Sequence, residues 1–472
     1  MNKSESELTL SLDLQRAAFN QTTPDLARRR ATLRALSVAL HKHRAELVAA
    51  VDQDFNGRAS AETLMLELFP LHAQIRHACH LLPKWMRRRN VPSPWYLWPA
   101  KAFYQYQPLG VVGVMGAWNY PILLTLGPAI EAIAAGNHVM IKPSEFAPRT
   151  ADLIASILAS TFAPEYVTCI RGGSEIGVAF ASLPFDHLFF TGSTATGRLV
   201  SQAAARNLVP VTLELGGKSP AIVHSDYPLE RALTRILSAK LVNAGQTCVA
   251  PDYLLLPAGQ ETECERLARM LVATQYPSVN GNPDYTSIAS TRHHSRLQAM
   301  LEDAQAGGAH LVDLAPDDAS ENDRGARMTP HLIFGVTDSM RVSQEEIFGP
   351  LLPVVLYRNI DEAIAYVNAR PRPLALYYFD NNSSRQDELL RKTMSGGVTI
   401  NDCLYHLAQP GLPFGGVGSS GHGHYHGFDG FVTFSKKRPV MLQRKLAATD
   451  LLRAPWPRRR WLVDFLLRVV SR

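Results

Sequence analysis

The sequence lacks the features that mark several common classes of protein. Its five cysteines are widely spaced and no two form a CxxC pair, so neither a disulfide framework nor a zinc site is indicated. No uninterrupted apolar run reaches the roughly 18 residues that a membrane-spanning helix needs. The N-terminus has no apolar segment of signal length, and we find no internal repeat. These absences favour a reducing, cytoplasmic location.

Charge is also scarce and unevenly placed. Only 19% of the 472 residues are charged, with a formal net charge of +6. From residue 436 onward, eleven basic residues face two acidic ones, which gives this segment a net charge of +9. The first 435 residues carry 37 basic and 40 acidic side chains, a net charge of −3. Because nucleic-acid-binding proteins carry positive charge on the folded body, this distribution argues against a nucleic-acid partner.

The length predicts two or three domains, and the apolar pattern predicts two α/β units preceded by helices. Prolines at positions 92, 94 and 99 predict an extended crossing segment before the first α/β unit. The second α/β unit is expected to begin near Val211, and the polar stretch 313–327 is expected to be a surface loop. The expected helices are 26–52, 61–86 and 151–161, and the expected strands are 110–115, 138–141, 187–190, 221–223, 254–256 and 352–356.

Two glycine-rich runs resemble phosphate-binding loops. Residues 416–421 satisfy GxGxxG, but no βαβ unit follows them, so we interpret this run as a tight loop. Residues 192–197 follow a predicted strand and open a predicted helix, 198–206, where backbone N–H groups favour a phosphate. An ordinary strand–helix turn explains the second run equally well.

Three residues suit nucleophilic catalysis, although each has a simpler explanation. Cys248 follows a turn of small residues that can leave its thiol accessible, but free cysteines are usually buried packing residues. Glu214 precedes a glycine pair and suits a general base, or it pairs with Lys218 at the surface. Asn119 lies in GAWNYP, where its amide can donate to an oxyanion or simply form a turn.

The order and spacing of the motifs resemble those of the aldehyde dehydrogenase superfamily. The resemblance covers residues 19–438, and its seven motifs are PLGVVG…WNYP at 108–121, IKPSE at 141–145, FTGS at 190–193, LELGGK at 213–218, GQTC at 245–248, EEIFGP at 345–350 and PFGG at 413–416. APDY at 250–253 and HYHG at 424–427 look like class 3 members. Within class 3, DFNGR at 54–58 and TFSK at 433–436 look most like bacterial coniferyl aldehyde dehydrogenases.

The resemblance implies a fold and a division of the chain. The fold would be α/β, with a Rossmann-type cofactor domain, an α/β catalytic domain and a bridging arm for oligomerisation. The implied boundaries are 1–213 for the NAD(P)-binding domain, with 90–107 as a bridging segment, 214–409 for the catalytic domain, 410–440 for a returning arm, and 441–472 for a basic amphipathic tail.

The resemblance also implies the roles of individual residues. Cys248 would attack the aldehyde, Asn119 would stabilise the oxyanion, and Glu214 would act as the general base. Tyr120 would contact substrate, although a packing tyrosine explains it as well. The residues implied to bind the cofactor are Trp118, Lys142, Ser144, Glu145, Gly192, Ser193, Gly197, Gly216, Glu346 and Phe348.

The implied reaction is NAD(P)-dependent oxidation of an aldehyde to a carboxylic acid through a thioester on Cys248. A carboxylate at Glu145 favours NAD over NADP, because it repels a 2′-phosphate. A coniferyl-type aromatic aldehyde is the first substrate expected, and a medium- or long-chain aliphatic aldehyde is the second. A non-redox thiol esterase or acyl transferase is the rival class, but it needs no cofactor residues. No metal site is expected, although His422, His424 and His426 alternate.

The C-terminal tail and the oligomeric state complete the expectations. Class 3 relatives are typically dimers, so we expect a homodimer. If residues 460–470 are helical, Arg460, Asp464 and Arg468 form one polar stripe on an otherwise apolar rod. About twelve helical residues reach only about 18 Å, too short to span a bilayer. The tail therefore docks on a subunit of the enzyme or lies peripherally at a membrane surface.

Overall fold

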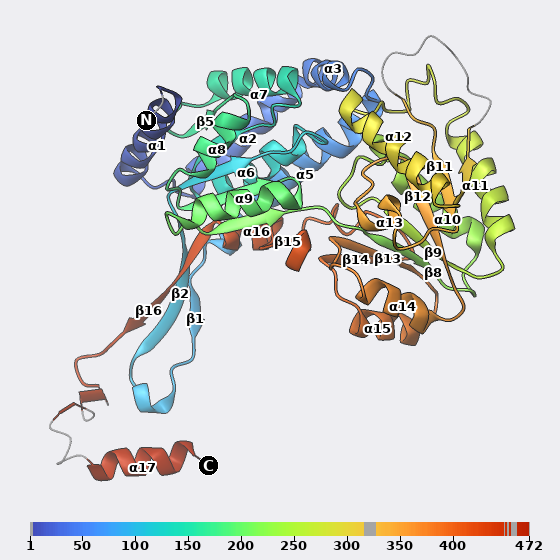
Figure 1. Ribbon diagram of the computed structural model, residues 1–472. Helices are drawn as coiled ribbons and strands as arrows, with labels where there is room; N and C mark the ends of the chain where they lie inside the picture. Colours follow the sequence, from blue (N-terminus) through green and yellow to red (C-terminus); the bar gives the residue numbers. More distant parts are fainter. Residues whose placement is uncertain (1–2, 316–326, 448, 451–452, 455–459, 472) are drawn as a thin grey trace.

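The computed structural model describes residues 3–315, 327–447, 449–450, 453–454 and 460–471. Within these residues the chain forms a six-stranded sheet, a seven-stranded sheet and a three-stranded antiparallel arm. Figure 1 shows the two larger sheets side by side, with the arm extending away from both of them. The fold is that of an α/β protein with parallel, Rossmann-like sheets, as predicted.

A layer of N-terminal helices covers the first sheet. The predicted helix 26–52 is wrong as a single element, because His43 leaves helical geometry (φ −96°, ψ 15°) and divides it. The predicted helix 61–86 is interrupted by a π-helical turn, Leu64–Leu68. The helices of this layer are α1 (Lys3–Gln21), α2 (Leu26–Lys42), α3 (Arg44–Phe55), α4 (Ser60–Thr63) and α5 (Phe69–Trp85).

The six-stranded sheet has the order β15-β7-β6-β3-β4-β5 and is parallel except for β15. The sequence pattern assigned the segment near Val211 to the second unit, but β7 pairs with β6, with Thr212 opposite Phe189. Its strands are β3 (Val111–Met115), β4 (His138–Lys142), β5 (Val167–Cys169), β6 (His187–Thr191), β7 (Val211–Glu214) and β15 (Gly421–His422). The helices joining them are α6 (Leu123–Ala135), α7 (Pro148–Thr161), α8 (Ser174–Ala181) and α9 (Thr194–Ala205).

The seven-stranded sheet has the order β10-β11-β12-β9-β8-β13-β14 and is parallel except for β10. Its strands are β8 (Pro220–Val223), β9 (Tyr253–Pro257), β10 (His310–Asp313), β11 (His331–Phe334), β12 (Leu351–Tyr357), β13 (Ala375–Phe379) and β14 (Gly397–Ile400). Its helices are α10 (Leu229–Leu241), α11 (Glu261–Gln275), α12 (Thr291–Ala306), α13 (Arg341–Gln344), α14 (Ile360–Asn368) and α15 (Ser383–Lys392). Most of the predicted loop 313–327, residues 316–326, lies outside the described residues.

The arm is formed by segments far apart in the sequence. Strand β2 (Lys101–Pro108) pairs with β1 (Arg89–Val91) on one side and with β16 (Ser435–Leu442) on the other. The short helix α16 (Gly427–Thr433) leads into β16.

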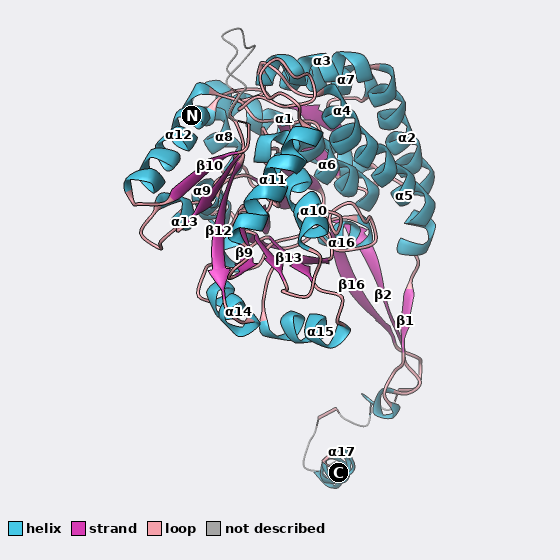
Figure 2. Ribbon diagram, turned by 90° about the vertical axis from the view of Figure 1, so that its right-hand side faces the viewer, coloured by secondary structure: helices cyan, strands magenta, loops and turns pink. Residues whose placement is uncertain are grey.

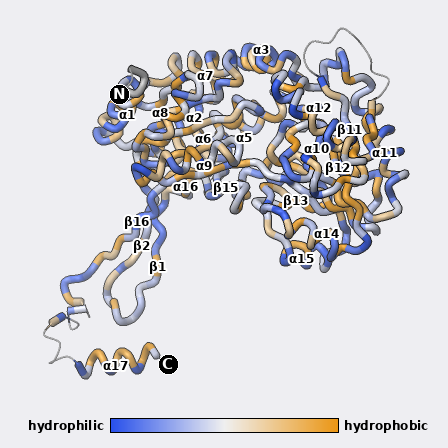
Figure 3. Tube along the Cα trace, in the orientation of Figure 1, coloured by the Kyte–Doolittle hydropathy of each residue, from blue (hydrophilic) through white to orange (hydrophobic). Residues whose placement is uncertain are grey.

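The C-terminal helix α17 (Arg460–Val470) is helical as predicted and lies beyond the arm, apart from the body in both views (Figures 1 and 2). Figure 3 shows charged residues interrupting an otherwise apolar helix. None of its described side chains is buried. Within the described residues, no helix combines the length and apolarity that crossing a bilayer requires.

Candidate active site

The two large sheets meet at a cavity of about 1150 Å³. One wall consists of residues at the carboxyl ends of β3, β4, β6 and β7, where ligands bind in open parallel sheets. The other wall holds Cys248, which precedes β9, and the segment after α13. Twelve residues of the predicted site line this cavity: Trp118, Asn119, Lys142, Ser144, Glu145, Gly192, Ser193, Glu214, Gly216, Cys248, Glu346 and Phe348.

Two residues of the predicted site do not line the cavity. Gly197 is buried in α9, where an added Cβ would lie 2.6 Å from Leu215, so it permits close packing of the helix. Tyr120 is also buried, and its hydroxyl lies 2.7 Å from Thr247 Oγ1, one residue before Cys248.

Cys248 faces the cavity at the end of a tightly constrained turn. Asn243 and Ala244 both have left-handed backbone (φ 52° and 50°), and Gly245 follows with φ 74°. An added Cβ on Gly245 would lie 2.2 Å from the Gly349 carbonyl, so only glycine fits there. Burial, and then the nearby carboxylates Glu346 and Glu214, raise the pKa of the Cys248 thiol to about 12. The thiol is therefore protonated at neutral pH and requires a base to become a nucleophile.

Glu214 supplies a carboxylate in the same cavity. It ends β7, is 3% exposed, and neither carboxylate oxygen has a hydrogen-bond partner among the described residues. Burial alone raises its pKa well above the ordinary value. A carboxyl group with an elevated pKa and free oxygens is suited to exchange protons with a thiol or a water molecule.

A hydrogen bond holds the side chain of Asn119. Its side-chain amide donates one hydrogen bond to the Gln246 carbonyl, at 3.1 Å. An amide nitrogen carries two N–H groups, so the second remains for a substrate oxygen in the cavity.

The surface pair considered for Glu214 is not formed: Lys218 instead pairs with Asp252.

The nucleotide side of the cavity combines a cation, a carboxylate and a helix N-terminus. Lys142 Nζ lies 2.8 Å from Glu145 Oε2, and Ser193 caps the N-terminus of α9 by accepting from the Thr196 N–H. The expected helix 198–206 thus begins earlier, at Thr194. A helix N-terminus of this kind favours a phosphate group. The other run, 416–421, forms a 3₁₀ turn (Gly418–Ser420) leading into β15, as predicted for a tight loop.

Glu346 and Phe348 close the opposite side. Glu346 Oε1 is buried with no hydrogen-bond partner among the described residues, and burial raises its pKa to about 8. An added Cβ on Gly216 would lie 2.0 Å from Glu346 Oε2, so the glycine gives this carboxylate room. Phe348 has left-handed backbone (φ 51°) and its ring lies 5.5 Å from that of Trp118. An unpartnered acceptor, a helix N-terminus and a long cavity fit a dinucleotide with ribose hydroxyls.

Several residues lining the cavity were missed by the sequence analysis. His293 and Arg296 lie on α12, and the His293 ring is tilted against that of Trp118, with 4.9 Å between the ring centroids. Arg296 donates to the Glu346 carbonyl at 3.1 Å and thereby fixes the loop that carries Glu346. Ser290 gives the sequence signal of a helix start, but nothing in the sequence indicates which face of that helix meets the cavity.

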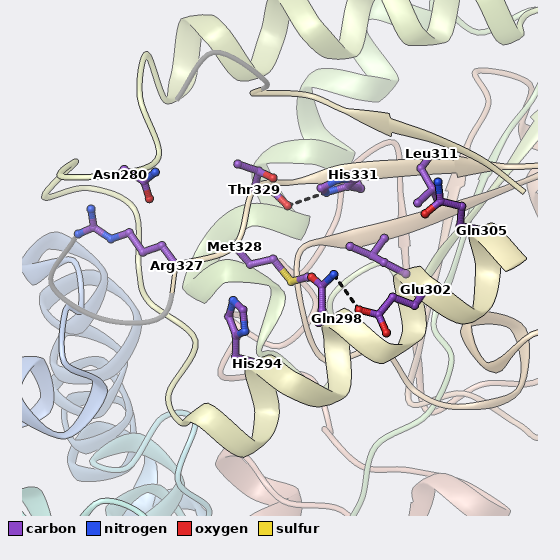
Figure 4. Close-up of a pocket in the computed structure, with 11 residues that line it drawn as sticks. Asn280, His294, Gln298, Glu302, Gln305, Leu311, Arg327, Met328, Thr329 and His331 are labelled. Atoms are coloured by element: carbon purple, nitrogen blue, oxygen red, sulfur yellow. Dashed lines mark hydrogen bonds between the residues drawn. The ribbon is translucent and has the colours of Figure 1, made fainter. Parts of the chain in front are cut away.

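A second, smaller cavity of about 360 Å³ lies beside α12 and β11 (Figure 4). His331 contacts the Thr329 carbonyl there at 2.9 Å, and Gln298 donates to Glu302 at 3.2 Å. No residue of the predicted site lines it. The chemistry described above therefore belongs to the first cavity.

Comparisons with known proteins identify the family of this chain. Residues 12–440 match the model of the aldehyde dehydrogenase family. A probable coniferyl aldehyde dehydrogenase of Pseudomonas aeruginosa is 47% identical over 94% of this chain and 92% of its own length. The 4,4′-diaponeurosporen-aldehyde dehydrogenase of Staphylococcus aureus is 40% identical over 91% of this chain and 92% of its own. An aldehyde dehydrogenase family 3 member A2 of Pongo abelii is 39% identical, over 90% and 86%.

Solved structures give the same result. The substrate-bound aldehyde dehydrogenase of Staphylococcus aureus superposes with a TM-score of 0.89 at 36% identity, covering 97% of this chain and 99% of the other. The NAD⁺ complex of an aldehyde dehydrogenase from Bacillus cereus superposes with a TM-score of 0.84 at 25% identity, covering 93% and 89%.

The chain belongs to the aldehyde dehydrogenase family, which confirms the resemblance seen in the sequence. It is an NAD(P)-dependent oxidoreductase acting on an aldehyde group, and the rival reading as a non-redox esterase or acyl transferase is disfavoured.

Proposed function

We propose that this enzyme oxidises a coniferyl-type aromatic aldehyde to its carboxylic acid, using Cys248, Glu214 and Asn119. The observation that carries the proposal is the convergence of these three side chains on one cavity with the cofactor-type residues. The relatives named as coniferyl aldehyde dehydrogenases support the aromatic substrate. A medium- or long-chain aliphatic aldehyde is the second candidate; the Staphylococcus relative is named for 4,4′-diaponeurosporen-aldehyde and not for coniferyl aldehyde.

The reaction begins with proton transfer from the Cys248 thiol to Glu214, because the thiol is protonated at neutral pH. The thiolate sulfur then bonds to the aldehyde carbon, and the former carbonyl oxygen becomes an oxyanion. The free N–H of the Asn119 amide and the Cys248 backbone N–H stabilise that charge. When bound, NAD(P) supplies the hydride acceptor for the oxidation.

Release of the product depends on the same carboxylate. After oxidation the acyl group is held on Cys248 as a thioester. Glu214 first releases to solvent the proton that it took from Cys248. Its carboxylate then removes a proton from a water molecule, whose oxygen attacks the acyl carbon, and the thiolate leaves as the carboxylic acid forms. The unpartnered oxygens of Glu214 are free to accept a hydrogen bond from that water.

NAD is the preferred cofactor in this proposal. Lys142, Ser144 and Glu145 would hold the adenosine ribose, Gly192 and Ser193 the pyrophosphate, and Glu346 and Phe348 the nicotinamide side. Trp118 and Gly216 complete the cofactor surface, and Gly197 supports it through packing. A negative charge at Glu145 disfavours a 2′-phosphate, although its pairing with Lys142 at 2.8 Å weakens that repulsion.

The test is an aldehyde panel followed at 340 nm with NAD and with NADP. The highest kcat/KM is expected for coniferyl-type aldehydes with NAD. A higher kcat/KM for aliphatic aldehydes would replace the aromatic assignment by the second candidate. No signal with any aldehyde would contradict the whole proposal.

The arm and the tail concern assembly. In this proposal the protein is a cytoplasmic homodimer joined through the arm, supported by the way β1, β2 and β16 extend from the body. The described residues of α17 lie apart from the body in Figures 1 and 2, which supports a contact with a partner subunit or a membrane surface over docking on its own subunit. Liposome flotation of the full chain and of a chain truncated after Arg453 separates these: flotation that disappears on truncation indicates a peripheral membrane contact.

A further inference from the structure

Arg58 is a buried cation close to the active site that the proposed chemistry does not use. It follows α3 in the DFNGR motif, and its side chain is 0% exposed. Burying a guanidinium without partners is strongly unfavourable, so its contacts report what it holds in place.

Its hydrogen bond reaches the proposed oxyanion residue. Nη1 of Arg58 donates to the backbone carbonyl of Asn119 at 3.0 Å. The guanidinium also lies over the ring of Tyr120, 4.9 Å from its centroid, and over that of Phe55 at 4.8 Å. Arg58 therefore contacts the backbone of Asn119 and the side chain of Tyr120.

Two buried carboxylates share this cation, and each holds one of the two catalytic loops. Glu67 lies 3.9 Å from Arg58 and accepts from the backbone N–H groups of Ile122 and Leu123, just after Asn119. Glu62 lies 3.5 Å from Arg58 and accepts from the backbone N–H of Asn243 at 2.8 Å. Asn243 begins the left-handed turn before Cys248.

The two loops are also bonded directly to each other. The Asn243 side chain donates to the Asn119 carbonyl at 3.0 Å, the same oxygen that accepts from Arg58. Asn119 comes from the six-stranded unit, whereas Asn243 and Cys248 come from the seven-stranded unit. The arginine and its two carboxylates thus fix the donor relative to the nucleophile across the junction of the two units.

We propose that Arg58 is a positioning residue that sets the Asn119 amide at the distance from Cys248 needed to stabilise the oxyanion. The inference rests on the proposed role of Asn119. Displacing a catalytic group by about 1 Å can cost about 100-fold in rate, and loss of one oxyanion donor costs about 10²–10³-fold. Arg58→Met should lower kcat/KM about 10- to 100-fold. The Kd of NAD should stay within about twofold, because Arg58 contacts no cofactor-type residue.

A second buried arginine provides the matched control. Arg29 is 5% exposed and its Nη1 donates to the carbonyls of Ala134 and Ala135, at the opposite end of α6 from Asn119. Arg29→Met removes a similar cation from similar carbonyl partners. It should lower the Tm but leave kcat/KM within about twofold of the wild-type value. An equal loss of kcat/KM in both variants would assign Arg58 a merely structural role.

Arg58→Lys guards against a variant that fails to fold. Lysine keeps a positive charge between Glu62 and Glu67 but lacks the planar fork that serves the Asn119 carbonyl at the same time. Its Tm should lie close to that of the wild type, and its kcat/KM between those of wild type and Arg58→Met. A kcat/KM equal to that of the wild type would overturn the proposal.

The decisive test is a double-mutant cycle with Asn119→Ala. If Arg58 acts through Asn119, adding Arg58→Lys to Asn119→Ala should lower kcat/KM by less than about twofold further. Multiplicative losses would show that Arg58 acts independently and overturn the inference. Full kcat/KM in Asn119→Ala alone would contradict the proposed oxyanion role of Asn119, and the inference about Arg58 would fail with it. This single variant therefore distinguishes a failure of the proposed function from a failure of the inference alone.

Discussion

The cavity wall contributed by the six-stranded sheet consists of regular strand ends, whereas the wall contributed by the seven-stranded sheet is made of strained turns. Within the described segments 115–119, 142–146, 190–193 and 214–216, no residue has a positive φ. On the other side, Phe348 lines the cavity, whereas Asn243 and Ala244 are buried in the turn before Cys248; all three have left-handed backbone without being glycine. Such a conformation costs about 1–2 kcal/mol per residue.

The difference in backbone strain follows the two proposed roles, cofactor binding on one side of the cavity and covalent chemistry on the other. Strand ends and a helix N-terminus offer ready-made binding groups for a nucleotide, so the cofactor wall needs no strain. The nucleophile must instead project from a turn that tertiary contacts enforce. Gln246 shows how this is done: it is fully buried and bonds to Asn243, Ser287 and Ala289. A strained backbone conformation beside a reactive group persists only where several surrounding contacts hold it in place.

The largest effect should come from the strained wall. Cys248→Ala removes the only atom proposed to bond to substrate, so aldehyde oxidation measured at 340 nm should fall at least about 10⁴-fold. The Kd of NAD, measured by fluorescence, should remain close to that of the wild type. Full activity in this variant would refute the assignment of the nucleophile, and a loss of NAD binding would show that the two walls are not separable.

Glu214→Gln should have the next largest effect, a fall in kcat of about 10²–10⁴-fold. The pKa of Glu214 is raised by burial, so wild-type activity should increase as pH rises through that pKa. The variant should lack this limb of the pH profile. A profile of unchanged shape would exclude Glu214 as the base.

The same substitution has a consequence for stability with a defined sign. A carboxyl group whose pKa is higher in the folded state stabilises the fold below its unfolded pKa, and that contribution is lost as pH rises through the folded pKa. Glu214→Gln cannot ionise, so its Tm relative to that of the wild type should increase as pH rises above the ordinary carboxyl pKa, until Glu214 ionises in the folded wild type. A constant difference in Tm would contradict the burial argument.

A smaller effect is expected on the cofactor wall. Glu145→Gln removes the charge proposed to face the adenosine ribose and releases Lys142 from its ion pair. The ratio of kcat/KM for NADP to that for NAD should increase about 10-fold, about 1.4 kcal/mol of differential binding, while kcat with NAD changes little. Glu165→Gln, elsewhere on the same unit, is the charge-matched control and should leave the ratio unchanged.

The smallest effect is expected for Ala244→Gly, which tests the cost of the left-handed backbone at Ala244. Ala244→Gly releases about 1 kcal/mol of backbone strain and loses about 0.8 kcal/mol of methyl burial, so the free energy of unfolding should change by less than about 1 kcal/mol. Ala132→Gly, inside α6, should lower it by about 1–2 kcal/mol, since glycine weakens a helix and leaves a small cavity. Urea denaturation measures both. An equal loss of unfolding free energy in the two variants would contradict the backbone strain inferred at Ala244.

Sequence motifs predicted the cofactor wall better than the catalytic turn. The family resemblance implied cofactor roles for Lys142 and Ser193 and a catalytic role for Glu214, and the structure places all three at or just after the carboxyl ends of parallel strands. The left-handed turn at Asn243 and Ala244 overrides local preference through distant contacts, which no local pattern reveals. The roles of His293 and of the cluster around Arg58 were missed for the same reason: each depends on contacts between segments remote in sequence.

The arm has a consequence for the order in which the molecule is built. Strand β2 leaves the ribosome early, but its partner β16 pairs Ser435 with Pro108 and Leu442 with Lys101, more than 300 residues later. Pairing at such a separation is slow and waits for the intervening chain. Both catalytic loops are therefore synthesised before the arm is complete. In the homodimer proposed above, an arm that is completed last would protect the nascent chain from premature association, so that subunits would meet only after their interiors are made.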